Sequence, residues 1–209
     1  GCELDVVKMS GWRRTMEFTD TGLPWMLPSP NVPTLATVRL YAGTCLFEGT
    51  NVSEGRGTTI PFEWIGAPWM RHRELAEKFN RRGLPGVHAH PVYMTPTFSK
   101  HQGRVCAGVR LFVTDAARLN AAEAGLCLLH DVIALHPDEF EWLKPPEGRK
   151  RYFIDLLAGG AEVRERVHTE EGLADILSRW RGEAREWLGL REPYLLYEGE
   201  SGWNTTSIG

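Results

Sequence analysis

The stretch CAGVRLFVTDAARLNAAEAGLCLLHDVIAL, residues 106–135, carries the two patterns that decide the fold. Apolar residues alternate with others over residues 106–114, which is typical of a half-buried β-strand. Asp115 can cap a helix that follows from residue 116 to about residue 135, and Pro137 lies just past its end. A strand followed at once by a long apolar helix predicts a domain in which helices cover a sheet.

Patterns on either side of this stretch extend the prediction. Strands are expected at 4–9, 87–94 and 194–197, and helices at 35–47 (capped by Thr34), 68–82, 152–158, 160–167 and 172–188. Strands that alternate with helices favour an α/β fold of the mixed α+β kind, with a small sheet layered with helices. The helices at 116–135 and 172–188 supply the largest apolar faces.

Composition excludes several classes of protein. The 209 residues are 42% hydrophobic and 24% charged, which fits a globular domain. The net charge is 24 − 27 = −3, whereas a nucleic-acid binder usually carries a basic surplus. No apolar run approaches the roughly 20 residues of a membrane helix, so no membrane span is expected. We therefore expect no nucleic acid as a partner and no membrane span.

Metal and cofactor motifs are not apparent either. The four cysteines are 43, 61 and 21 residues apart, which fits no zinc spacing, and we expect small buried side chains. His88 and His90 lie two apart on an expected strand, with no third metal-type residue nearby. The glycine-rich segment lacks the Gly-Lys-Ser/Thr of a P-loop. The prediction is a protein with no metal and no cofactor.

Chemistry is concentrated in LFEGTNVSEGRGTTIPFEWIGAPW, residues 46–69, whose first half follows no helical or strand period. Long ordered loops are often functional. Glu48 and Glu54 are a candidate pair of carboxylates for glycoside hydrolysis, and Arg56 is a fork-shaped donor suited to a ligand carboxylate. The alternative is that the two glutamates pair with Arg56 and hold the loop.

Neutral and basic side chains of two loops are candidates for contacts with a sugar. Asn51 and Thr58 have groups that could bond sugar hydroxyls or satisfy the backbone of their own loop. A second polar loop, residues 95–101, carries Lys100 and His101, either of which could meet an anion. An exposed histidine with no function is the alternative for His101. These residue types suit a polar ligand rich in hydroxyl groups.

Several segments together resemble one family, the exo-β-N-acetylmuramidases of the NamZ type, known earlier only as a bacterial domain of unknown function. The similar segments are GLPW (22–25), PSPNVPTL (28–35), CLFEGTN (45–51), SEGRGTT (53–59), PFE (61–63), IGAPW (65–69), TPTFSKH (95–101), FEW (140–142), DLLAG (155–159) and YLLY (194–197). The resemblance covers about residues 4–197.

The resemblance implies a fold and an activity. Members of the family are glycoside hydrolases that release N-acetylmuramic acid from the non-reducing ends of peptidoglycan fragments. They combine a Rossmann-like N-terminal domain with a smaller mixed α/β C-terminal domain, and the active site lies in the cleft between them. The family's Pro-Glu-His-Gly segment, associated with the catalytic glutamate, belongs to the N-terminal domain and has no match in this chain.

By this resemblance the chain is the C-terminal portion of a two-domain protein. Residues 1–33 would be the last strand of the N-terminal domain and an extended linker, residues 34–200 the C-terminal mixed α/β domain, and residues 201–209 a loose tail. The N-terminal domain, largely absent here, would be its partner, and the location would be extracytoplasmic, either periplasmic or secreted. A non-catalytic carbohydrate-binding or interaction domain is the alternative function, and a purely structural domain is a third.

The same resemblance assigns roles to the candidate residues. Glu48, Asn51, Glu54 and Arg56 would line the wall of the cleft and position the sugar, and Thr58 and Lys100 complete the predicted substrate-binding residues. Arg56 or Lys100 would meet the lactyl carboxylate of N-acetylmuramic acid. Glu48 and Glu54 remain the candidate catalytic residues of this chain, although the family's general acid belongs to the other domain.

Overall fold

A computed structural model of the chain describes residues 1–145, 147–148 and 150–197. Its elements are η1 (Phe18–Thr21), α1 (Leu35–Thr44), η2 (Cys45–Gly49), β1 (Trp64–Ala67), α2 (His72–Arg81), β2 (Val87–Met94), β3 (Cys106–Val113), α3 (Ala121–Leu135), α4 (Phe153–Leu157), α5 (Glu162–Arg166), α6 (Glu170–Arg191) and η3 (Glu192–Tyr194). The chain divides into two compact units, residues 27–178, and residues 1–26 together with the chain from Arg179 onward.

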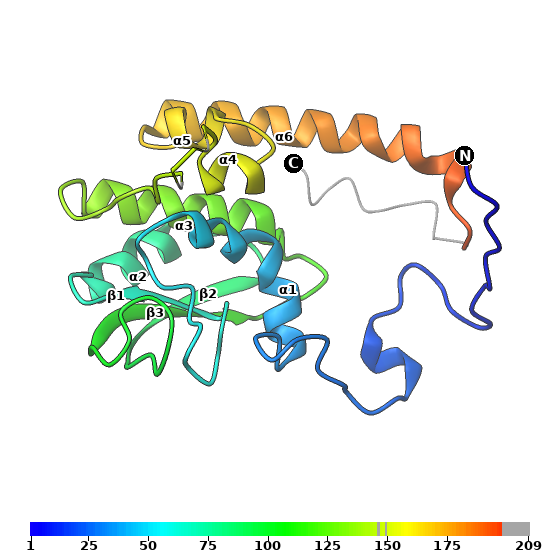
Figure 1. The fold of residues 1–209 in the computed structure, drawn as a ribbon, viewed down its shortest axis with the longest axis horizontal. Coiled ribbons are helices and arrows are strands. Elements are labelled where there is room, and N and C mark those ends of the chain that lie inside the picture. The colour runs from blue at the N-terminus through cyan, green and yellow to red at the C-terminus, as the bar shows by residue number, and fades with distance from the viewer. Residues whose placement is uncertain (146, 149, 198–209) are drawn as a thin grey trace. The chain divides into compact units, whose positions relative to one another are not determined.

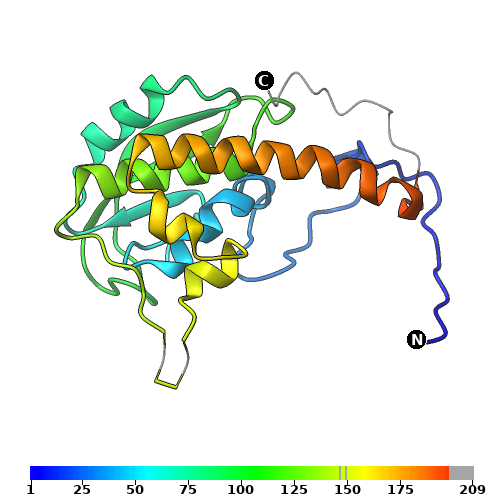
Figure 2. The ribbon, with the colours of Figure 1, turned by 90° about the horizontal axis from the view of Figure 1, so that it is seen from above.

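The larger unit is built on a three-stranded antiparallel sheet in the order β1-β3-β2. Central strand β3 pairs Val109 with Ile65 of β1 and with Pro91 of β2. Figures 1 and 2 show α1, α2 and α3 over one face of this sheet, with α4, α5 and the first turns of α6 outside that helical layer. The predicted mixed α/β fold with a small, helix-covered sheet is confirmed.

Large apolar side chains fill the space between the sheet and its helices. Phe47, Ile65, Phe79, Leu111 and Leu128 are each no more than 1% exposed. Burial of such a side chain stabilises a fold by roughly 1.5–3 kcal/mol. The core therefore draws on η2, β1, α2, β3 and α3 together, which ties the segment before β1 to the rest of the unit.

Two glycines set the distance between α1 and α3. A Cβ atom on Gly43 would lie 1.8 Å from the Ala121 carbonyl oxygen, and one on Gly125 would lie 2.3 Å from the carbonyl carbon of Gly43. Real Cβ atoms do not approach so closely, so the two backbones touch only because both residues lack a side chain. The interruption of the apolar pattern by Gly43 is thus a packing requirement.

Several boundaries differ from the prediction. Strand β2 occupies residues 87–94 as expected, but α2 begins at His72 instead of residue 68, because residues 64–67 are drawn into β1 and a turn follows. Helix α3 begins at Ala121, where the Asn120 side chain accepts the Glu123 N–H. The predicted cap Asp115 instead bonds the Ala117 N–H in a preceding turn.

The predicted strands at 4–9 and 194–197 are wrong for this structure. Within the part of the chain that the structure describes, residues 4–9 pair with no strand, and Leu4 and Val7 are 77% and 95% exposed. A strand needs a hydrogen-bonded partner. The segment around Tyr194 is the short helix η3, with Pro193 in its first turn. The loose tail predicted for residues 201–209 lies outside the described residues.

The smaller unit is held by contacts between the two ends of the chain. The backbone N–H of Met9 donates to the Tyr197 hydroxyl at 2.8 Å, and the Trp12 ring meets Tyr197 edge-on at 4.8 Å. Phe18 and Trp25 form a second edge-on pair at 5.2 Å. The predicted domain boundaries at residues 33 and 200 stay a prediction. Within the described residues, no helix combines the length and apolar character needed to cross a membrane.

Candidate functional site

The two polar loops predicted from the sequence lie against each other. The Gly57 carbonyl oxygen accepts hydrogen bonds from the Thr97 backbone N–H at 2.8 Å and from the Thr97 hydroxyl at 2.9 Å. Gly57 has a φ of +82°, and a Cβ atom there would lie 2.4 Å from the Phe98 carbonyl oxygen. Only glycine allows this approach. Loop 46–63 and loop 95–101 therefore form one surface, hereafter the paired loops.

Arg56 joins the two candidate carboxylates. Its Nη2 lies 2.9 Å from Glu48 Oε2, and its Nε lies 3.1 Å from Glu54 Oε1. The guanidinium also covers the Phe62 ring, 5.0 Å from its centroid. Side-chain exposure is 29% for Arg56, 17% for Glu48 and 3% for Glu54. Of the alternatives left open by the sequence, the structure shows the one in which both glutamates pair with Arg56.

Lys100 points into the loops and uses all of its donor capacity. Its ammonium group lies 2.8 Å from the Phe47 carbonyl oxygen, 3.0 Å from that of Val52 and 2.9 Å from Glu54 Oε2. A fourth acceptor, the Glu48 carbonyl oxygen, lies at 3.4 Å. An ammonium has three protons to donate. Burial lowers the pKa of Lys100, although the carboxylate of Glu54 opposes that effect. In this arrangement Lys100 braces the loop.

Other candidates also bond to the backbone. Asn51 donates through Nδ2 to the Glu139 carbonyl oxygen at 2.8 Å and accepts the Glu141 N–H through Oδ1 at 3.0 Å. The Thr58 hydroxyl donates to the Gly55 carbonyl oxygen at 2.7 Å. His101 Nε2 lies 2.8 Å from the Asn51 carbonyl oxygen, and burial lowers the pKa of this ring. Asn51 thus holds its loop to the segment after α3.

The backbone of the paired loops is strained. Three described residues other than glycine have positive φ: Phe62 at 62°, Ser99 at 69° and His101 at 58°. All three lie in the paired loops. Each such residue costs about 1–3 kcal/mol and persists only where its surroundings fix it, as is common at functional sites. The strain marks the same surface that the sequence singled out.

A surface depression of about 450 Å³ opens where the loops meet the end of β2. Its lining combines four threonines, two aromatic residues, one glycine and one methionine: Gly57, Thr58, Thr59, Tyr93, Met94, Thr95, Thr97 and Phe98. Ligand pockets commonly enclose about 300–1,000 Å³ and present a few polar groups among apolar ones. Thr58 is the one predicted site residue that lines it.

Glu63 was missed as a site residue by sequence reasoning. This 2% exposed carboxylate accepts from the hydroxyls of Thr34 and Thr37 at 2.5 and 3.1 Å, and from Arg110 Nη2 at 3.0 Å. Thr34 is also the N-cap of α1, since it accepts the Thr37 N–H. Glu63 therefore fixes the start of α1 to strand β3. The predicted cap at Thr34 was the available signal, but it did not indicate a partner 29 residues away.

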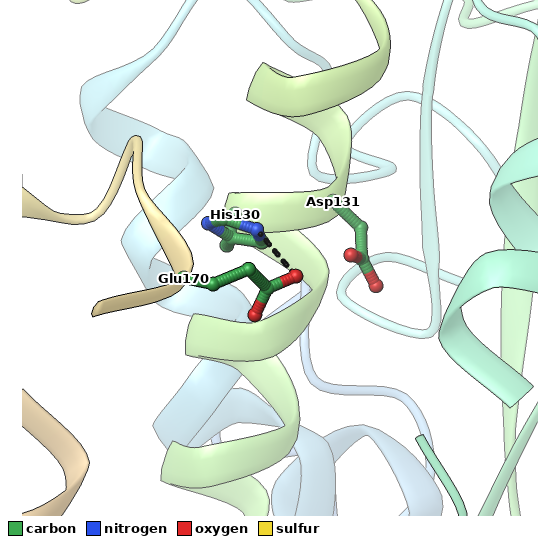
Figure 3. A group of neighbouring side chains, drawn as sticks. All are labelled: His130, Asp131 and Glu170. Atoms are coloured by element: carbon green, nitrogen blue, oxygen red, sulfur yellow. Dashed lines mark ion pairs between the residues drawn. The ribbon is translucent and has the colours of Figure 1, made fainter. Parts of the chain in front are cut away.

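A second group of acidic and histidine side chains gathers between α3 and α6 (Figure 3). His130 Nε2 lies 3.1 Å from Glu170 Oε1, and His130 Nδ1 lies 2.6 Å from the Val167 carbonyl oxygen. Asp131, fully buried, receives both arms of the Arg82 fork at 2.9 and 2.7 Å. A metal ion would have to displace that fork, so the donor set does not fit a metal.

Arg82 also organises Glu170. It donates to Glu170 Oε1 at 3.0 Å, and Lys78 stands 3.4 Å from Asp131 and 3.7 Å from Glu170. Desolvation raises the pKa of Glu170, but the hydrogen bonds and charges of Arg82 and His130 outweigh it and hold that pKa below its ordinary value. The cluster is an ion-pair network that joins α2, α3 and α6.

Comparison with known proteins gives two family matches. The family "Exo-beta-N-acetylmuramidase NamZ, C-terminal" matches residues 39–197, and the corresponding N-terminal family matches residues 1–36. A curated relative from Bacillus subtilis (strain 168), "Peptidoglycan beta-N-acetylmuramidase NamZ", is 43% identical over 195 residues. The alignment covers 93% of this chain and 46% of the relative, so the chain spans about half the relative's length.

Two crystal structures of DUF1343 family proteins from Bacteroides fragilis NCTC 9343 are similar to the chain. One has a TM-score of 0.81 at 30% identity and covers 94% of this chain and 51% of the other. The second has a TM-score of 0.58 at 28% identity and covers 83% and 44%. Together with the match over residues 39–197, these likenesses show that the chain belongs to the NamZ C-terminal family.

Proposed function

We propose that this chain is the C-terminal part of an exo-acting glycoside hydrolase that releases N-acetylmuramic acid from the non-reducing ends of peptidoglycan fragments. The activity named for the Bacillus subtilis relative supports the reaction class. The N-terminal family match over residues 1–36 supports a preceding domain as the partner. Because peptidoglycan lies outside the cytoplasm, the proposed location is periplasmic or secreted.

The observation that supports placing substrate binding in this chain and the general acid in the N-terminal domain is the double ion pair of Arg56. A general acid must hold a proton and deliver it to the leaving oxygen. Glu48 and Glu54 instead accept hydrogen bonds from Arg56, and Glu54 accepts a further one from Lys100. Their geometry suits the wall of a binding cleft. The general acid is accordingly assigned to the N-terminal domain, and the acetamido group of the sugar is proposed as the internal nucleophile.

Arg56 is the proposed reader of the lactyl carboxylate. Its bonds to the two glutamates use Nε and Nη2, which leaves Nη1 of a side chain that is 29% exposed. A guanidinium N–H donates a strong, charge-assisted hydrogen bond to a carboxylate. Lys100 is the weaker of the two predicted readers, because its protons already have acceptors within the protein. Arg56 is therefore the basic side chain of the wall that keeps a donor group, Nη1, for the lactyl carboxylate.

Turnover of a chromogenic N-acetylmuramide tests this assignment. The 209-residue chain preceded by an N-terminal NamZ domain should hydrolyse it, whereas the chain alone should bind N-acetylmuramic acid without turnover. Glu48→Gln in the two-domain protein should retain activity within about tenfold, since loss of a general acid or nucleophile typically removes 10²–10⁴-fold or more. A loss beyond about a thousandfold with an unchanged melting temperature would make Glu48 catalytic and contradict the proposal.

The alternative function is a carbohydrate-binding domain with no part in catalysis. The ion-paired state of both glutamates is the observation that favours it. It predicts binding of N-acetylmuramic acid by the chain alone, and also no turnover when the N-terminal domain is present. The two-domain measurement therefore separates the two functions.

A further inference from the structure

Two aromatic side chains, Tyr93 and Phe98, are exposed in the depression at the paired loops. Tyr93, near the end of β2, is 61% exposed, and Phe98 is 50% exposed. Both line the depression of about 450 Å³. Large rings left open at a concave surface commonly mark a binding site, because they offer a broad apolar face at little entropic cost. Neither residue takes part in the carboxylate-reading wall described above.

The lining is uncharged throughout. Its polar side chains are those of Thr58, Thr59, Thr95, Thr97 and Tyr93, and no Lys, Arg, His, Asp or Glu among the described residues lines it. The Thr58 and Thr97 hydroxyls donate to the Gly55 and Gly57 carbonyl oxygens, so toward a ligand they act as acceptors. A hydroxyl without such a bond can both donate and accept. An aromatic face beside such groups matches a pyranose ring, which has an apolar face and an edge of hydroxyls. An anionic sugar would find no countercharge here, so the lining selects a neutral ring.

The Tyr93 ring and the backbone that carries Phe98 are held in place before any ligand arrives. Tyr93 packs against the His72 ring, with centroids 4.4 Å apart, and its backbone pairs with Ala107 of β3. Phe98 lies in the loop that packs so closely on Gly57 that a Cβ atom there would lie 2.4 Å from the Phe98 carbonyl oxygen. The next residue, Ser99, has a positive φ. A surface fixed in this way loses little conformational freedom when it binds.

The depression adjoins Arg56 along the chain, since Gly57 and Thr58 directly follow it. In peptidoglycan each N-acetylmuramic acid is β-linked to N-acetylglucosamine, which has no lactyl group. We propose that the Tyr93–Phe98 depression binds this neutral N-acetylglucosamine ring on the leaving-group side of the bond. The proposal rests on the proposed function and adds a second subsite, specific for the uncharged sugar.

Amide chemical shifts of the 209-residue chain, titrated with methyl β-N-acetylglucosaminide and separately with N-acetylmuramic acid, test the proposal. The glucosaminide should shift the amides of Thr95 and Phe98. Tyr93→Ala and Phe98→Ala should each weaken its binding by about tenfold, the size expected when a stacked ring is removed. Binding of N-acetylmuramic acid should change less than about twofold.

Phe153→Ala is the matched control, because Phe153 is 43% exposed but lies on α4, outside the depression. It should change neither sugar's binding. Unaltered glucosaminide binding in both Tyr93→Ala and Phe98→Ala, or none in the wild type while N-acetylmuramic acid binds, would overturn the subsite and leave the proposed function standing. Wild-type chain that binds neither sugar would contradict both. Melting temperatures within a few degrees of wild type confirm that the variants are folded.

Discussion

Replacing Lys100 with methionine should destabilise the larger unit strongly. The substitution keeps the apolar stem but removes the ammonium that bonds Glu54 and the carbonyl oxygens of Phe47 and Val52. Among the described residues, Glu54, 3% exposed, would then have Arg56 as its one charged partner. Breaking a buried ion pair costs about 3–5 kcal/mol. The Lys100 side chain is 19% exposed, so we expect the lower part of this range, about 3–4 kcal/mol.

Urea denaturation, followed by tryptophan fluorescence, measures the effect. With a slope of about 2 kcal/mol per M, the Lys100→Met midpoint should fall by about 1.5–2 M. Lys78→Met is the matched control: Lys78 is 28% exposed, and its partner Asp131 keeps both bonds from Arg82. That variant should lose less than about 1 kcal/mol. A Lys100→Met loss within about 1 kcal/mol would refute the bracing role and return Lys100 to the list of anion readers.

Three further predictions concern helix packing, pH and the α3 ion pairs. Gly125→Ala should lower the free energy of unfolding by about 1–3 kcal/mol or more, because the new Cβ atom would strike the Gly43 backbone. Gly182→Ala on α6, with open space around it, is the control and should raise the free energy of unfolding by up to about 1 kcal/mol. Equal urea midpoints for the two variants would contradict the packing argument. Burial lowers the pKa of His136, so folding favours the neutral ring. The stability that His136 contributes is therefore complete above about pH 6.5 and declines as the pH falls below that value. His136→Gln should remove this part of the pH dependence of the urea midpoint, and a pH dependence between about pH 7.5 and 5 that equals that of the wild type would contradict the prediction. Asp131→Asn should destabilise by about 3 kcal/mol, while a chelator leaves the melting temperature unchanged; a chelator-induced drop would indicate a metal instead.

Local chemistry was enough to predict the elements that carry a clear period. Strand β2 matches its prediction at both ends, and the Thr34 cap of α1 is confirmed. Strand β1 was missed because all four of its residues are buried, so no alternation appears, and its identity comes from pairing with β3. The start of α3 was misplaced because Asp115 and Asn120 are both good cap residues. The Gly86 carbonyl oxygen, which accepts the N–H groups of residues 114 and 115, holds Asp115 in a turn.

The candidate site was predicted in composition but not in geometry. The opposite charges of Glu48, Glu54 and Arg56 allowed two predictions, a pair of catalytic carboxylates or ion pairs with Arg56. The burial of Lys100 could not be read, because two of its acceptors are carbonyl oxygens 48 and 53 residues earlier, and every residue has a carbonyl. Tyr93 lies within a sequence pattern typical of a strand, which does not indicate an exposed ring. Its exposure depends on how loop 95–101 folds back onto Gly57.

The most direct test of the account is the selectivity conferred by Arg56. In the two-domain protein, kcat/KM for a chromogenic N-acetylmuramide should exceed that for the matching N-acetylglucosaminide. Arg56→Lys keeps the positive charge near Glu48 and Glu54 but loses the planar fork. It should reduce the ratio of the two kcat/KM values by about tenfold or more, with the rate on the glucosaminide little changed. A ratio that stays within about twofold of wild type would contradict the claim that this wall recognises the lactyl carboxylate.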